Sequence, residues 1–214
     1  DNSELDLGSS TIATSDLGTI NYNGANNVIT SNGSIDNTGA NLTWGNNTIL
    51  QLGSGGVITG GTIGSVGSGN VLISAINGSS VLDGVTLDTD LTIGTSGASA
   101  TATLIINDGL TLNNGATVTL QQGPNSYSSK RYLTFAGTQT LGGTGEIVFG
   151  ATSGAGSTQN HITANGTLTI GPNVTIRNSL LGNAFISNSD GTVNNEGSIT
   201  AAVSYTHLRA HETR

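Results

Sequence analysis

The sequence predicts an all-β solenoid of stacked short strands, a parallel β-helix, and three observations lead to this fold class. Hydrophobic residues make up 34% of the 214 residues and charged residues only 8%, which is enough apolar surface for an ordered chain. Short runs of Val, Ile, Leu and Thr lie between turns drawn from 33 Gly and abundant Asn, a composition that favours strands. The third observation is a repeat.

The repeat is marked by Asx-Gly pairs that each precede a short strand, a polar turn and a second strand. Five such pairs are Asn32-Gly33, Asp83-Gly84, Asp108-Gly109, Asn165-Gly166 and Asp190-Gly191. They belong to a series of near-evenly spaced glycines, namely Gly8, Gly33, Gly60, Gly84, Gly109, Gly137, Gly166 and Gly191. This spacing predicts about eight coils of about 26 residues, in which stacking supplies the core that one coil lacks.

The stretch "NGTLTIGPNVTI", residues 165–176, shows what one coil contains. Alone it predicts a hairpin, because Asn-Gly precedes alternating apolar residues. Within the repeat it becomes a corner followed by two faces, and Leu168 should pair in parallel with residues one coil away. The inward residues are then Leu168, Ile170, Val174 and Ile176, with Thr167, Thr169 and Thr175 outside. An antiparallel β-sandwich is the alternative, although its core needs more aromatic residues than the 4% found here.

Two stretches carry a resemblance to a known family. "GTLTIGPNVTI" and "VNNEGSITA", with Asn195, Gly197, Ile199 and Ala201 in an Asn-x-Gly-x-Ile-x-Ala pattern, resemble repeats of bacterial filamentous-haemagglutinin-like adhesins and autotransporter passengers. The resemblance implies a single-stranded right-handed parallel β-helix in a secreted or surface-exposed, outer-membrane-associated protein. It also implies a structural or adhesive role, with a glycan or protein of a host or environmental surface as partner and neighbouring coils of a longer chain packed alongside.

The last residues differ from the rest in composition. Residues 204–214, "SYTHLRAHETR", contain neither Gly nor Asn and resemble translated adapter sequence. We therefore expect residues 1–203 to be a β-helix fragment of a longer chain and 204–214 to be a non-native or disordered tail. His207 and His211 accordingly do not belong to a candidate site.

Composition also bears on partners. The chain has no Cys, which excludes disulfides and thiolate metal sites. Its formal net charge of −8 disfavours binding to nucleic acid or an anionic membrane. No run of 18 apolar residues exists that would predict a membrane span.

Catalytic residues are sparse, so we expect no enzyme activity, no cofactor and no metal site. Asp88 and Asp90 flank one residue of a predicted turn. Local hydrogen bonding within that turn is a simpler role for them than calcium binding. His161 and Glu146 are isolated, and a glycoside hydrolase needs two carboxylates. The alternative that stays open is a carbohydrate-active β-helix fragment, similar to polysaccharide lyases or hydrolases, with catalytic residues partly outside this chain.

One segment departs from the repeat and is the candidate binding loop. "QQGPNSYSSKRY", residues 121–132, lies in a long unit and contains two Tyr beside the basic pair Lys130-Arg131. Loops on rigid scaffolds often carry binding function, and Tyr with Lys or Arg suits contacts to sugar or protein. The predicted ligand-binding residues are Tyr127, Lys130, Arg131 and Tyr132.

Overall fold

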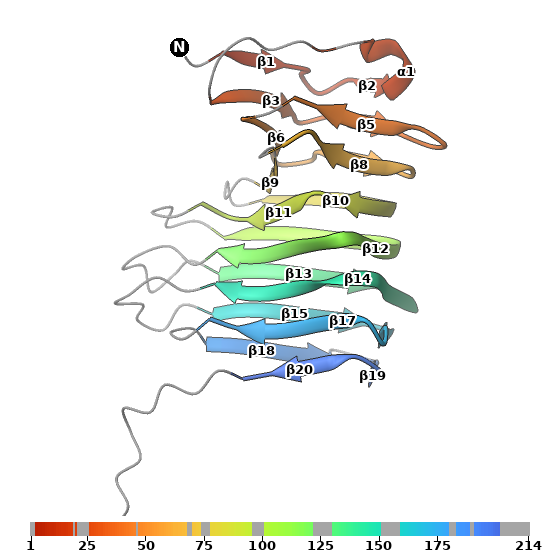
Figure 1. The fold of residues 1–214 in the computed structure, drawn as a ribbon, viewed down its shortest axis with the longest axis vertical. Coiled ribbons are helices and arrows are strands. Elements are labelled where there is room, and N and C mark those ends of the chain that lie inside the picture. Colours follow the sequence, from red (N-terminus) through yellow and green to blue (C-terminus); the bar gives the residue numbers. More distant parts are fainter. Residues whose placement is uncertain are drawn as a thin grey trace, which may run out of the picture.

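The fold is all-β apart from one short helix, and its strands form a parallel sheet that curls around a common core (Figure 1). The computed structural model describes residues 3–18, 20, 26–45, 47–67, 70–73, 78–95, 101–121, 130–150, 159–179, 183–188 and 191–201. Within these ranges the strands stack in layers, and each layer contributes to up to three faces.

The first face contains nine strand segments that pair in chain order. They are β1 (Glu4–Asp6), β3 (Asn27–Ser31), β6 (Thr48–Leu52), β9 (Asn70–Ile73), β11 (Asp90–Ile93), the ends of β12 (Ala102–Gln121) and β14 (Gln139–Gly150), β17 (Val174–Asn178) and β20 (Ser198–Thr200). Every one of these pairings is parallel. At the spacing of about 4.8 Å between neighbouring strands, eight steps give a stack about 38 Å tall.

The second face precedes the third in each layer. Its strands are β2 (Thr11–Ala13), β4 (Ser34–Asp36), β7 (Val57–Thr59), the start of β10 (Gly78–Asp88), the start of β12, β13 (Lys130–Ala136), β15 (Gln159–Asn165) and β18 (Asn183–Asn188). The third face contains β5 (Asn41–Trp44), β8 (Thr62–Ser65), the end of β10, the middle of β12, the start of β14, β16 (Thr167–Ile170) and β19 (Thr192–Asn195).

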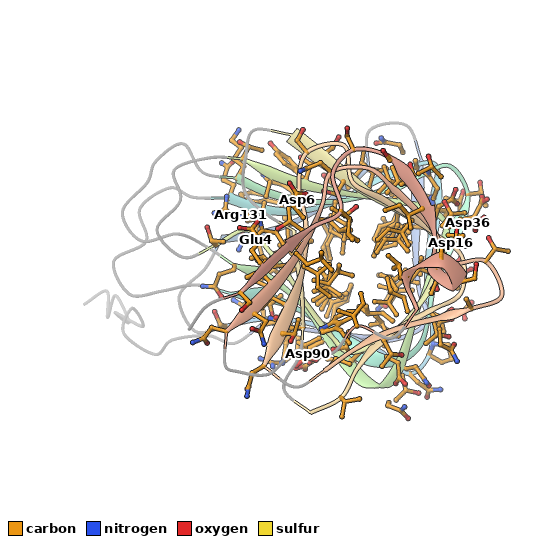
Figure 2. The ribbon with its side chains drawn as sticks, turned by 90° about the horizontal axis from the view of Figure 1, so that it is seen from above. Glu4, Asp6, Asp16, Asp36, Asp90 and Arg131 are labelled. Carbon is orange, nitrogen blue, oxygen red and sulfur yellow. The ribbon has the colours of Figure 1, made fainter. Side chains whose placement is uncertain are left out.

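The core consists of columns of inward side chains that run through the stack, because parallel pairing in register places like positions above one another. One first-face column is Leu5, Ile29, Leu50, Val71, Leu91, Val118, Ile147, Ile176 and Ile199. Its interior members are buried, and Ile147 and Ile176 are 0% and 1% exposed. Viewed along the stack, the faces surround these side chains while Asp16, Asp36 and Asp90 lie at the perimeter (Figure 2).

The unit at residues 165–176 confirms the parallel pairing. Leu168 pairs in parallel with Gln139 in the coil before it and with Val193 in the coil after it. The predicted inward residues Leu168, Ile170, Val174 and Ile176 are at most 1% exposed. The antiparallel sandwich is wrong, since all pairings between described strands are parallel.

The glycine series needs a correction. Gly60, Gly84, Gly109, Gly137, Gly166 and Gly191 each follow a second-face strand and mark one corner. Gly33 instead precedes the second face and is level with Gly56, because Val57 donates to its carbonyl oxygen. Gly8, whose carbonyl accepts from Asn32, belongs to that earlier corner too.

The number of residues per coil also varies more than the glycine spacing predicted. One full coil takes the first-face column from Val71 to Leu91, and a later one takes it from Val118 to Ile147. The later coil is clearly the longer, so the repeat is approximate rather than fixed.

The helix α1 (Thr14–Leu17) was not predicted and lies at the N-terminal end of the stack (Figure 1). It follows β2 at the chain position where later layers place a third-face strand. The Thr14 hydroxyl donates to Oδ1 of the buried Asn37 at 2.9 Å, and Leu17 packs against the core. So short a helix cannot show a helical hydrophobic period, which is why the sequence carried no signal for it.

Candidate functional site

The predicted binding loop is only partly a loop. Lys130, Arg131 and Tyr132 begin strand β13, and Gln121 ends strand β12. Tyr127 lies outside the described residues. Alternation along β13 leaves Lys130 and Tyr132 half-buried on the outer surface and turns Arg131 inward. The three described residues therefore do not share one surface.

Arg131 is a buried cation held by main-chain carbonyls. Its side chain is 1% exposed. Its Nε donates to the carbonyl oxygen of Gln121 at 2.8 Å, and the two terminal nitrogens donate to those of Lys130 at 3.2 Å and Thr95 at 3.3 Å. Burial lowers the pKa of the guanidinium below its usual value, because desolvation disfavours the charged form. These hydrogen bonds connect neighbouring layers, so the role of Arg131 in this arrangement is structural.

Tyr132 belongs to a feature that the sequence did not reveal, a stack of three outward rings on the second face that we call the aromatic ladder. Tyr132, His161 and Phe185 occupy the same register position on β13, β15 and β18. Their ring centroids are 5.0 Å and 4.9 Å apart, with interplanar angles of 22° and 15°. The three residues belong to three successive coils and become neighbours only through the register, so no local motif could have identified them.

The ladder has a polar border. Lys130 lies on the same strand as Tyr132, and Gln159 accompanies His161 with a ring-nitrogen to Oε1 distance of 3.3 Å. Burial lowers the pKa of His161, and the nearby Lys130 charge lowers it further. The imidazole is accordingly neutral near pH 7, which suits ring stacking and hydrogen bonding rather than charge pairing. This border combines aromatic edges with one amine and one amide.

Asp88 and Asp90, at the corner between the third and first faces, accept hydrogen bonds from the neighbouring layer. Asp88 Oδ1 accepts from the side-chain amides of Asn114 at 2.6 Å and Asn113 at 3.3 Å. Asp90 Oδ1 accepts from the main-chain N–H of Thr117 at 2.9 Å. Thr89 separates β10 from β11, and the printed hydrogen bonds of both carboxylates reach residues of the next coil, not the local partners that the sequence predicted. No cluster of three or more metal-ligating side chains occurs among the described residues.

Glu146 and Arg177 form an ion pair across two layers of the first face. Both Arg177 Nε and a terminal nitrogen lie 2.7 Å from the Glu146 carboxylate oxygens. The Arg177 hydrogen bond lowers the Glu146 pKa, and Glu146 in turn raises the pKa of Arg177. The Glu146 carboxylate is thus paired with the Arg177 guanidinium on the outer surface. This ion pair is a cross-strand contact between two neighbouring layers.

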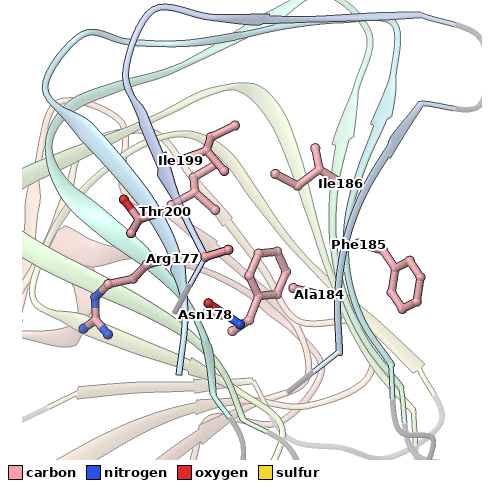
Figure 3. A pocket seen from close by; sticks show the side chains of 10 residues that line it. Arg177, Asn178, Ala184, Phe185, Ile186, Ile199 and Thr200 are labelled. Carbon is pink, nitrogen blue, oxygen red and sulfur yellow. The ribbon is translucent and has the colours of Figure 1, made fainter. Parts of the chain in front are cut away.

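One cavity lies at a corner of the stack and another at its C-terminal end. A polar groove of about 500 Å³ follows the corner between the second and third faces and is lined by Asp108, Gln139, Thr138, Thr140 and neighbouring residues. An apolar cavity of about 440 Å³ opens at the C-terminal end of the stack. Figure 3 shows Ile186 and Ile199 pointing into this second cavity while Phe185 points away from it.

Comparison of the chain with protein-family models, with curated proteins and with solved structures finds no match. Among the described residues, no helix is long and apolar enough to cross a membrane.

Proposed function

We propose that this chain is a segment of a single-stranded right-handed parallel β-helix that serves as a rigid structural or adhesive scaffold of a secreted or surface-exposed bacterial protein. The observation that carries the proposal is the first-face column, which continues in register from Leu5 to Ile199 through nine parallel strands. A continuous stack of strands resists bending, because each layer is hydrogen-bonded to the layers on either side.

The direction of winding supports the handedness. In Figure 1 the nearer first-face strands β12, β14, β17 and β20 run to the left, and the fainter β18 behind them runs to the right, while the chain descends from its N-terminus. Seen from the N-terminal end this is a clockwise path that moves away from the viewer, the sense of a right-handed coil. The resemblance to bacterial surface repeats supplies the remaining part of the proposal, namely secretion and attachment.

The contact surface that best fits an adhesive role is the aromatic ladder with its border. Tyr132 and Phe185 present ring surface, and Lys130 and Gln159 supply hydrogen-bond donors, the combination that suits a glycan or a polar protein surface. Arg131 is too deeply buried to contact such a ligand in this conformation. The proposed ligand contacts are therefore the outward residues of β13, β15 and β18.

The experiment is a binding and turnover panel on the purified chain. We expect a β-rich circular dichroism spectrum, retention on a glycan or matrix-protein array, and no release of reducing ends or unsaturated products from pectin, alginate or glucan. A double variant, Lys130→Ala with Tyr132→Ala, should lose array binding while Asp16→Ala, at the N-terminal helix, keeps it. Clear turnover of any polysaccharide would overturn the scaffold proposal in favour of a carbohydrate-active fragment.

A further inference from the structure

The aromatic ladder stops in the middle of the stack, at Tyr132. In the next layer toward the N-terminus its outward register position belongs to Thr103 of β12, and in the layer after that to Ser79 of β10. Both side chains are small. One face of the Tyr132 ring contacts His161, and among the described residues no ring stacks on the opposite face. The sequence of β10 and β12 therefore leaves this ring face uncovered well inside the stack.

A shallow hollow of about 290 Å³ lies at these small side chains. Three of the residues that line it carry hydroxyl groups, and the lining residues are Gly78, Ser79, Thr101 and Thr103. Its volume is close to the lower limit of about 300 Å³ for small-molecule pockets, a size that suits one sugar ring. Because Tyr132 follows Thr103 at a layer spacing of about 4.8 Å, a ring in this hollow would continue the ladder on the uncovered face of Tyr132.

A positive charge lies beside the hollow. Lys130 precedes Arg131 as Thr101 precedes Ala102, so the register places Lys130 one layer away from Thr101. The four-carbon side chain of lysine is long enough to span that step. Among the described residues no carboxylate forms an ion pair with Lys130, and its charge adds to the lowering of the His161 pKa by burial. The ammonium group is therefore available to an anionic ligand.

We propose that this hollow is a subsite for one acidic pyranose ring, as in a hexuronate. The sugar ring stacks on the uncovered face of Tyr132, its carboxylate binds the ammonium group of Lys130, and its hydroxyls hydrogen-bond to those of Ser79 and Thr103. The inference rests on the proposed adhesive function and names the class of sugar that the aromatic ladder takes.

The net charge of −8 is compatible with an acidic ligand at this place. Asp83, the acidic residue that β10 contributes to the second face, lies about 13 Å along the strand from Ser79. That separation exceeds the Debye length of about 10 Å at 0.1 M salt, so its repulsion is largely screened. Lys130 is closer to the hollow and sets the local charge.

The test is a nuclear magnetic resonance titration of the full chain with two single-ring probes. Methyl β-D-glucuronide carries the carboxylate, and methyl β-D-glucoside is the matched neutral ring. We expect the glucuronide to bind with a Kd on the order of 1 mM and the glucoside to bind about tenfold more weakly. Lys130→Gln should remove this difference, because it removes the charge. Tyr132→Ala should abolish binding of both probes, because it removes the stacking surface.

A variant that fills the hollow tests where the sugar ring lies. Thr103→Phe places a ring on the uncovered face of Tyr132 and should abolish glucuronide binding, with an unchanged far-ultraviolet circular dichroism spectrum. Thr163→Phe is the matched control, since Thr163 is an outward residue of β15 on the same face but does not line the hollow. This control should bind the glucuronide as the wild type does.

Each other outcome contradicts the inference. Equal affinity of the wild type for the two probes would show that Lys130 does not select an acidic sugar. Binding that persists in Thr103→Phe, or that is lost equally in Thr163→Phe, would place the sugar outside the hollow. Absence of glucuronide binding up to about 20 mM would overturn the subsite. Retention on the glycan and matrix-protein array is a separate readout, so a chain that is retained there but binds neither probe keeps the proposed function and loses only this subsite.

Discussion

At the scale of single residues, the most unusual group is the guanidinium of Arg131 inside an apolar stack. It stands in the second-face register between Ala102 and Asn160 and is satisfied by carbonyls from three different segments. The Cβ of any residue at position 94 would lie 1.8 Å from Arg131 Nε, so Gly94 makes room for it. A buried cation of this kind specifies one arrangement of the layers around it.

Replacing Arg131 by Leu should lower the free energy of unfolding by about 3 kcal/mol, because three partly buried main-chain carbonyls would lose their charged donor. The measurement is urea unfolding monitored by circular dichroism. Arg177→Leu is the matched control, since this arginine side chain is 42% exposed and its ion pair should contribute less than about 1 kcal/mol. Equal effects of the two substitutions would contradict the assigned role.

His161 should make the protein less stable in mild acid. Its pKa in the folded state lies below the ordinary value of 6.5, so the unfolded chain takes up the proton more readily. The stabilising contribution is therefore complete above pH 6.5 and is lost as the pH falls below it. His161→Phe keeps a ring in the ladder and should lose less stability than wild type between about pH 7 and about pH 5. Urea midpoints across this range test it, and identical pH profiles would count against it.

At the scale of elements, the corners explain where glycine is required. A Cβ at Gly191 would lie 1.8 Å from the carbonyl oxygen of Gly166, and one at Gly166 would lie 2.5 Å from the carbonyl of Gly137. Gly166 and Gly191 therefore approach the preceding layer too closely for any side chain, whereas Gly137 faces open space and Gly84 has no atom nearer than 3.9 Å. The Asx-Gly pairs mark corners rather than hairpin reversals: at Gly33, Gly166 and Gly191 the layers approach closely, and at Gly84 and Gly109 the backbone has a positive φ.

Gly143 and Gly115 provide a matched test of close approach against backbone strain. Both have positive φ, +83° and +79°, but a Cβ at Gly143 would lie 1.9 Å from the carbonyl oxygen of Leu112 while Gly115 faces open space. Gly115→Ala should cost about 1 kcal/mol from the left-handed backbone alone. Gly143→Ala should cost at least about 2 kcal/mol more, since the layers must separate. Thermal unfolding measures both, and similar losses would contradict the role assigned to layer contact.

At the scale of the whole molecule, stability should vary along the stack because each layer contacts only its neighbours. We expect the slowest amide hydrogen exchange in β12, β13 and β14, whose inward residues are buried on both sides. Exchange should be fastest in β1 and β20, with intermediate values between. Mass spectrometry of exchanged peptides measures this profile. Uniform protection from end to end would show that the layers unfold as one unit.

Local features of the chain were predicted better than contacts between coils. The inward positions of residues 165–176 were predicted because alternation in a strand is a local property. The binding segment was predicted less well, because nothing in "SSKRY" shows that Lys130 starts a strand or that Arg131 turns inward. The ladder partners of Tyr132 lie one and two coils further along the chain, and their contact depends on coil lengths that vary between layers.

The sequence by itself determined the secondary-structure class, the parallel stacking and the inward residues, since these follow from composition, alternation and an approximate repeat. Only the tertiary structure decided the register, and with it the two separate glycine corners, the main-chain carbonyls around Arg131, and the aromatic ladder of Tyr132, His161 and Phe185. The physical reason is that side-chain direction is set within a few residues, whereas the choice of neighbour depends on the length of every turn between two layers.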